Sequence, residues 1–138
     1  MDTRFSVAVH MLILISESPE PISSDQMAES VGTNASYIRK ILSLLRKAGI
    51  VEARRGISGS RLAVAPDRLT LLQIYLAVVE EGIHLIDIHR NSNDMCIVGK
   101  HIGPMLTDML DGVTRAFAEA LGDRKLSDCI EGIRKRIR

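Results

Sequence analysis

The sequence predicts a mainly α-helical protein that carries one small β-hairpin. Apolar residues make up 46% of the 138 residues and aromatic residues only 3%, so the core must be built from aliphatic side chains, which suit helices. Most of the chain follows the apolar spacing of amphipathic helices. In residues 50–64, apolar and polar side chains instead alternate along two short segments with a turn of two glycines between them, which is typical of a hairpin.

The first predicted helix covers residues 3–16, and Asp2 or Thr3 can cap its first turn. Its apolar side chains lie on nearly every side, so we expect it to be buried on most faces. Pro19 and Pro21 end it. At nine residues, 7–15, its apolar run is too short to span a bilayer.

Two short helices follow, separated by the turn 32–34. Ser23 and Gln26 have the spacing of a capping box at the start of the first. The second is predicted over 35–48, ends at Gly49, and carries one apolar stripe of four residues, Ile38, Ile41, Leu42 and Leu45.

The rest of the chain begins with the hairpin, whose strands are predicted at 50–54 and 61–64 around the turn 55–60. A helix over 69–81, capped by Thr70, ends at Gly82. Residues 83–88 are apolar and form either a strand or an extended link, and 91–94 are a polar loop. Two helices complete the chain, at 99–121 and 127–137.

The turn at 32–34 has the spacing of a DNA-binding helix-turn-helix. Ala28 lies four residues before Gly32, so the helices can approach closely, and Gly32 tolerates the backbone angle of a tight turn. With the hairpin as a wing, these elements predict a winged helix-turn-helix. An ordinary helical hairpin with a solvated basic face is the alternative. The candidate DNA-binding residues are Ser24, Thr33, Asn34, Ser36, Tyr37, Arg39, Lys40, Arg54, Arg55, Ser58 and Arg61.

The distribution of charge supports a polyanionic partner for this part of the chain. Net charge is only +1, but residues 34–68 hold eight basic residues against Glu52 and Asp67, a surplus of six. Double-stranded DNA is therefore the expected partner.

Three stretches carry a resemblance to a known family. They are Asp2-Thr3-Arg4-Phe5, the run from Ser36 to Val51, and Leu69-Thr70-Leu71-Leu72-Gln73-Ile74-Tyr75. The chain resembles the Rrf2 family of bacterial winged-helix regulators, which includes regulators of cysteine metabolism and of iron–sulfur clusters. Residues 91–100 are most similar to its YwnA-like subgroup. The resemblance implies a homodimer that reads a dyad-symmetric DNA site with two winged heads.

The long helix predicts a dimer independently of that resemblance. Its apolar residues are spaced alternately four and three apart, as in a coiled-coil seam. Together they present more apolar surface than one small domain can cover. Folding back onto its own domain is the alternative. The predicted interface residues are Ile102, Leu106, Met109, Val113, Ala116 and Phe117. We expect residues 1–82 to form the DNA-binding domain and 83–138 the linker, the dimerisation helix and the last helix.

Cys96 is a candidate sensor because it precedes the long helix, where a thiolate is favoured. The other interpretation is a small apolar residue that anchors the loop. Family members with an iron–sulfur cluster have three cysteines in this region, and here Cys96 is alone. The sequence therefore predicts no such cluster, no metal site and no cofactor.

Phosphate-loop, zinc-protease and nucleophile–base motifs are absent from the sequence, so we do not expect an enzyme. We expect a cytoplasmic, homodimeric, DNA-binding regulator, most simply a repressor, without membrane association. The alternatives are a thiol- or metal-responsive regulator and an interaction module that kept the fold without DNA binding. An unknown protein partner or small effector is compatible with each.

Overall fold

The computed structural model describes residues 2–53 and 59–138. Its helices are α1 (Arg4–Glu17), α2 (Ser24–Val31), α3 (Ala35–Lys47), α4 (Leu71–Val78), α5 (Ile97–Gly122) and α6 (Leu126–Ile137), with a 3-10 turn η1 (Pro66–Arg68). Two short strands, β1 (Val51–Ala53) and β2 (Ser60–Leu62), pair in antiparallel fashion. The predicted mainly α fold with one hairpin is confirmed.

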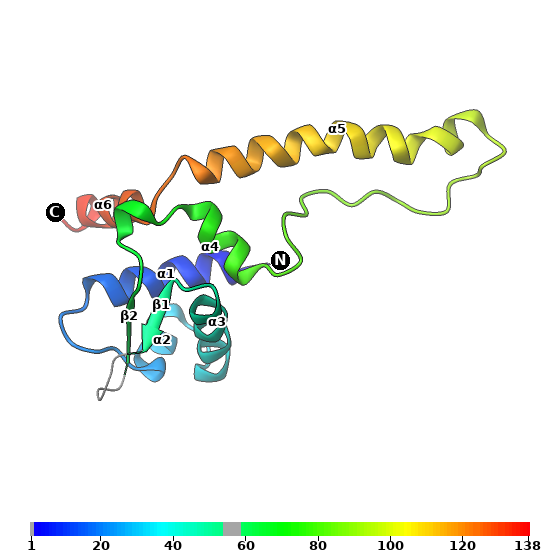
Figure 1. The fold of residues 1–138 in the computed structure, drawn as a ribbon. Helices are drawn as coiled ribbons and strands as arrows, with labels where there is room; N and C mark the ends of the chain where they lie inside the picture. Colours follow the sequence, from blue (N-terminus) through cyan, green and yellow to red (C-terminus); the bar gives the residue numbers. More distant parts are fainter. Residues whose placement is uncertain (1, 54–58) are drawn as a thin grey trace.

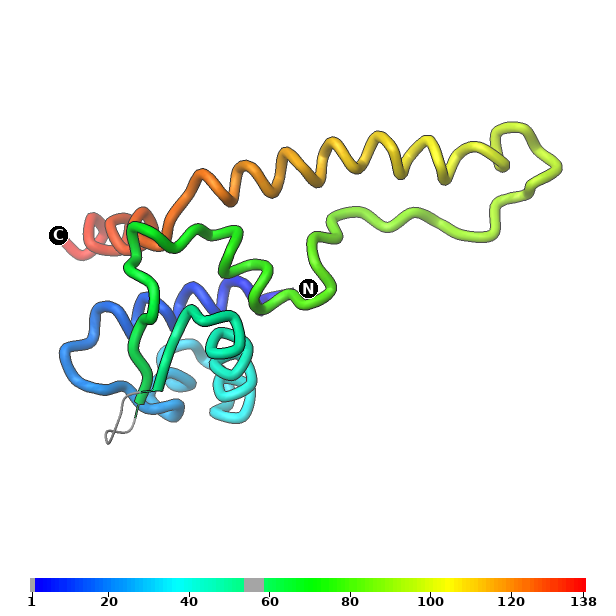
Figure 2. Tube along the Cα trace, in the orientation of Figure 1, coloured from blue at the N-terminus to red at the C-terminus, as the bar shows by residue number. Residues whose placement is uncertain are grey.

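A body of short helices surrounds α1, and α5 projects from it as a long arm (Figure 1). Helices α2 and α3 and the hairpin lie on one side of α1, and α4 lies between α1 and α5. Residues 83–93 form neither helix nor strand, so the strand considered for 83–88 is wrong. Figure 2 shows this link running beside α5 before it turns back into the helix.

The core consists of aliphatic side chains from α1 to α4, as the composition predicts. In α1, Val7, Ala8, Met11, Leu12 and Ile15 are buried. Several others, including Phe5 and Leu14, are half-buried against the same core. Most faces of α1 are therefore buried, as predicted, by other elements of the same chain.

The last helix packs into this core as well. Leu126 is fully buried and Ile130 nearly so. Backbone hydrogen bonds of 2.9 Å join Leu126 N–H to Leu69 O and Leu71 N–H to Arg124 O, so the chain around 124–126 is pinned beside the start of α4. The division of the chain into a DNA-binding domain over residues 1–82 and a dimerisation region over residues 83–138 stays a prediction.

Helix α4 is shorter than predicted, because it ends at Val78 and not at residue 81. Val79 leaves the helical conformation and is buried. Glu81 then turns toward the start of α1, where its carboxylate pairs with Arg4. Among the described residues, no helix combines the length and the apolar character needed to cross a membrane.

Candidate DNA-binding surface

Helices α2 and α3 are joined by a tight turn that local hydrogen bonds define. Ser23 and Gln26 form the predicted capping box at the start of α2. Gly32 has a φ of +84°, a backbone conformation that side chains disfavour, and its N–H donates to Ala28 O at 2.9 Å. The Asn34 side chain accepts from Tyr37 N–H at 2.8 Å and caps α3. Asn34 thus serves as the N-cap of the helix whose first residues are candidates for base contact.

Helix α3 has one buried face and one exposed face. Its apolar stripe of Ile38, Ile41, Leu42 and Leu45 is buried, as predicted. Ser36, Arg39 and Lys40 are exposed on the other side, and the Arg39 guanidinium lies 3.4 Å from Ser36 Oγ. Tyr37 and Thr33 are half-buried, and so is Ser24 at the first position of α2. The exposed face therefore offers short polar groups and cations together.

The hairpin is held against the end of α3. Arg46 of α3 donates to Ser60 Oγ at 3.0 Å, and Ser60 of β2 is buried. Glu52 and Arg61 are paired positions of the two strands, and Arg61 Nε donates to Glu52 Oε1 at 2.6 Å. Of the predicted wing residues, Arg61 is exposed, whereas Arg54, Arg55 and Ser58 lie outside the described residues.

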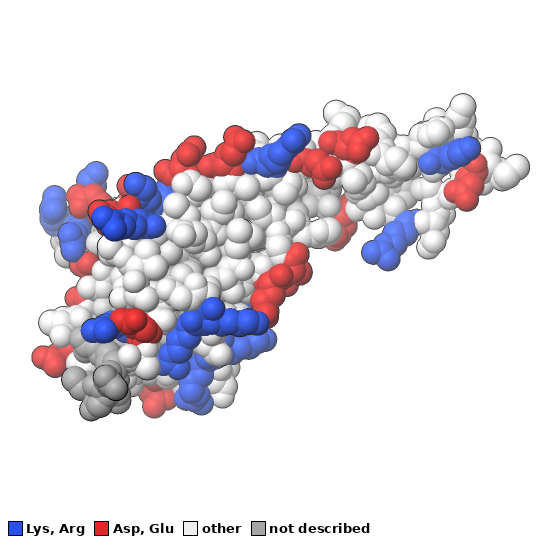
Figure 3. Space-filling model, viewed as in Figure 1, with Lys and Arg blue, Asp and Glu red and all other residues white. Residues whose placement is uncertain are grey.

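Lys and Arg side chains gather over the part of the molecule where α3 lies, and acidic side chains line the outer side of α5 (Figure 3). On α3 the exposed cations are Arg39, Lys40, Arg46 and Lys47. The local basic surplus of the sequence thus becomes a basic surface beside the hairpin.

The predicted seam of α5 is open to solvent in the single chain, and none of the 26 residues of α5 is buried. Met109 and Val113 keep 67% and 47% of their surface exposed. Ala116 is exposed, and Ile102 and Leu106 are half-buried. Phe117 differs from these residues, because its ring packs edge-on against Tyr75 of α4 with 5.6 Å between centroids.

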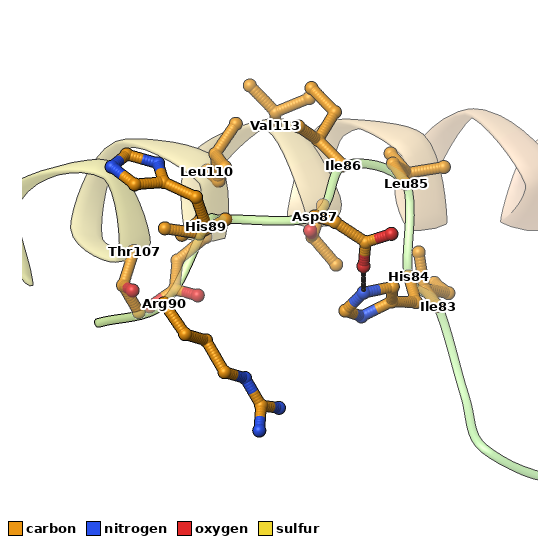
Figure 4. A pocket seen from close by; sticks show the side chains of 13 residues that line it. Ile83, His84, Leu85, Ile86, Asp87, His89, Arg90, Thr107, Leu110 and Val113 are labelled. Carbon is orange, nitrogen blue, oxygen red and sulfur yellow. Dashed lines mark hydrogen bonds and ion pairs between the residues drawn. The ribbon is translucent and has the colours of Figure 1, made fainter. Parts of the chain in front are cut away.

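A groove of about 660 Å³ lies between the link and α5, and sequence reasoning did not predict it. Residues 83–90 form one wall, where His84 pairs with Asp87 (Figure 4). Leu110 and Val113 line the opposite wall. The groove depends on the path of an irregular link, and a local sequence pattern does not encode that path.

Cys96 is the N-cap of α5 and is exposed in the single chain, and its role as a sensor or as an anchor of the loop stays a prediction. The backbone N–H groups of Gly99 and Val98, in the first turn of α5, lower the pKa of the Cys96 thiol. Burial raises the pKa of Cys129, which is half-buried against the core.

Two helices joined by a tight turn, followed by a hairpin attached to the second helix, define a winged helix-turn-helix protein. The family model for Rrf2, described as an iron-dependent transcriptional regulator, matches residues 1–132. The chain is 38% identical to YwnA of Bacillus subtilis (strain 168), a candidate HTH-type transcriptional regulator, over 93% of this chain and 95% of the relative.

Two further matches agree with that assignment. The HTH-type transcriptional regulator NsrR of Bacillus licheniformis is 25% identical over 93% of this chain and 88% of its own length. A crystal structure of a candidate DNA-binding protein matches with a TM-score of 0.77 and 36% identity, covering 92% of this chain and 98% of the other. The chain belongs to the Rrf2 family. Its relatives are transcriptional regulators and not enzymes.

The family description names iron, and a protein that binds iron needs a set of donor side chains around the metal. The described residues of this chain do not form such a set. The chain has two cysteines: Cys96 is the N-cap of α5, and Cys129 lies in α6. Within residues 2–53 and 59–138, no three His, Cys, Asp or Glu side chains are grouped so that they could hold a metal ion.

Proposed function

We propose that this protein is a homodimeric, sequence-specific DNA-binding regulator of transcription, acting in the cytoplasm and most simply as a repressor. The observation that carries the proposal is the exposed face of α3, where Ser36, Arg39 and Lys40 stand beside a hairpin fixed to the same helix. Short polar side chains can hydrogen-bond to base edges, and cationic side chains can pair with phosphates.

In this proposal α3 enters the major groove. Asn34, Ser36 and Tyr37 face the base edges, while Arg39 and Lys40 bind phosphates. Ser24, at the first position of α2, and Thr33, in the turn before α3, contact the DNA backbone beside this helix in the proposal. The hairpin reaches the adjacent backbone or minor groove, and its candidate contacts are Arg54, Arg55, Ser58 and Arg61.

The dimer in this proposal forms through α5. The exposed seam supports it, because Met109 and Val113 keep 67% and 47% of their surface in water, which leaves apolar surface that a second copy would cover. Two copies related by a two-fold axis present two α3 helices, so the bound site should be dyad-symmetric.

Selection of bound duplexes from a random pool tests the proposal directly. The full chain should enrich one sequence with two inverted half-sites. Failure to enrich any sequence, by protein that is folded, would favour an interaction module that kept the fold without DNA binding.

A further inference from the structure

The hairpin carries an ion pair on its outer face. Glu52 and Arg61 occupy paired positions on β1 and β2, so their side chains point to the same side of the hairpin. Arg61 Nε donates to Glu52 Oε1 at 2.6 Å. Their neighbours Val51 and Ser60 are buried on the inner side, which leaves this pair as the outward-facing group of the described hairpin.

This pair lies where the proposed function needs free positive charge. Between residues 34 and 66, Glu52 is the only acidic residue in the sequence. The hydrogen bond from Arg46 to Ser60 holds the hairpin beside the basic face of α3. The Glu52 carboxylate pairs with the guanidinium of Arg61, which would otherwise be free to bind a phosphate.

The pair can exchange partners without any change in the fold. The Arg61 and Glu52 side chains are 64% and 47% exposed, so a phosphate can reach the guanidinium from solvent. Exposed ion pairs are weak and screened by salt, so the carboxylate competes with a phosphate but does not exclude it.

We infer that Glu52 limits the affinity of the protein for DNA by holding Arg61 away from the phosphate backbone. The inference rests on the proposed function, because it assumes that the hairpin contacts DNA. Glu52 acts through Arg61 and is therefore a positioning residue. Its effect falls on a contact that carries no base information, so it lowers binding to specific and non-specific duplexes alike.

The size of the effect follows from counterion release. Each phosphate neutralised on duplex DNA steepens the plot of log affinity against log salt by about 0.9. If freeing Arg61 adds one such contact, Glu52→Gln should steepen this slope by up to about one unit. Affinity at 0.1 M salt should then rise roughly three- to eightfold.

The test measures Kd by fluorescence anisotropy between 50 and 300 mM KCl, with the full chain, the duplex enriched from the random pool and one unrelated duplex. The matched control is Glu119→Gln, which changes the net charge equally at an exposed position of α5. Glu52→Gln should raise affinity and steepen the slope on both duplexes. Glu119→Gln should change affinity by less than about twofold, as expected for an exposed charge on a helix outside the proposed DNA-binding surface.

A double-mutant cycle separates an effect through Arg61 from direct repulsion of phosphates. In the Arg61→Gln background, Glu52→Gln should gain almost nothing and leave the slope unchanged. An equal gain in that background, or an equal gain from Glu119→Gln, would overturn the inference while the unchanged protein still binds DNA. If the unchanged protein binds neither duplex, the proposed function itself fails and the inference fails with it.

Discussion

Replacement of Met109 by Asp should dissociate the proposed dimer while leaving the single chain folded. Met109 lies in the α5 seam, and 67% of its surface is exposed when only one chain is present. The monomer therefore has no core contact to lose at this position, and an aspartate there stays in water. In a dimer through this face, the same side chain would be buried in both copies.

The cost of the substitution can be worked from this exposure. Complete burial of a Met side chain stabilises a protein by about 1.5–3 kcal/mol. Because about two-thirds of Met109 is exposed in the single chain, its burial by a partner would contribute about 1–2 kcal/mol per chain. Enclosing a carboxylate in the same place adds at least about 1 kcal/mol per chain. Over two copies the loss is at least about 4 kcal/mol, which raises the dimer dissociation constant roughly a thousandfold or more.

Sedimentation equilibrium over a range of protein concentrations measures this constant, and circular dichroism reports the helix content. Arg115→Asp is the matched control, because it places the same side chain on the opposite side of α5 at an exposed position. It should leave the dimer intact. A Met109→Asp protein that sediments as a dimer with the constant of the unchanged chain would refute the assignment of this face.

Three further predictions concern single positions. Gly59→Ala should lower the free energy of unfolding by about 1–2 kcal/mol, because φ is +115° and the added Cβ would lie 3.0 Å from Pro21 Cβ; an unchanged urea midpoint would argue against this close approach. Cys96 should react with iodoacetamide at pH 7.5 before Cys129, because the pKa of its thiol is lowered and that of Cys129 is raised; peptide mass spectrometry would contradict this if Cys129 were labelled first. Hydrogen bonds from Arg4 hold the pKa of Asp2 at about 2 and lower the pKa of Glu81, so their contribution to stability is present above the usual carboxyl range and lost as the pH falls through the lowered values. Glu81→Gln should therefore flatten the loss of stability below pH 5 in urea titrations, and an unaltered pH dependence would remove Glu81 from the pairing.

The helix-turn-helix could be predicted from sequence because its signals are local. The capping groups Ser23 and Asn34, and Gly32 in the turn, act within four residues of their partners. The apolar stripe of α3 repeats with the helical period and is buried as that period predicts. Neighbouring residues thus carry nearly all the information for the candidate recognition helix.

The features that sequence reasoning missed depend on distant partners. The apolar pattern at 69–81 fits a longer helix, but Val79 is buried and Glu81 reaches Arg4, 77 residues earlier in the chain. The pairing of Glu52 with Arg61 depends on the strand register, which the sequence alone left open across a Gly-containing turn. The exposure of Cys96 depends likewise on the path of the link before α5.

The measurement that tests the central claim most directly compares the duplexes enriched from a random pool by the unchanged protein, by Ser36→Ala and by Arg39→Ala. If α3 reads the major groove, Ser36→Ala should change the enriched sequence. Arg39→Ala should enrich the original sequence and flatten the plot of log affinity against log salt by about one unit. If Ser36→Ala enriches the original sequence with undiminished preference, and Arg39→Ala changes the preference at an unaltered salt slope, the assignment of α3 as the base-reading helix with these roles is wrong.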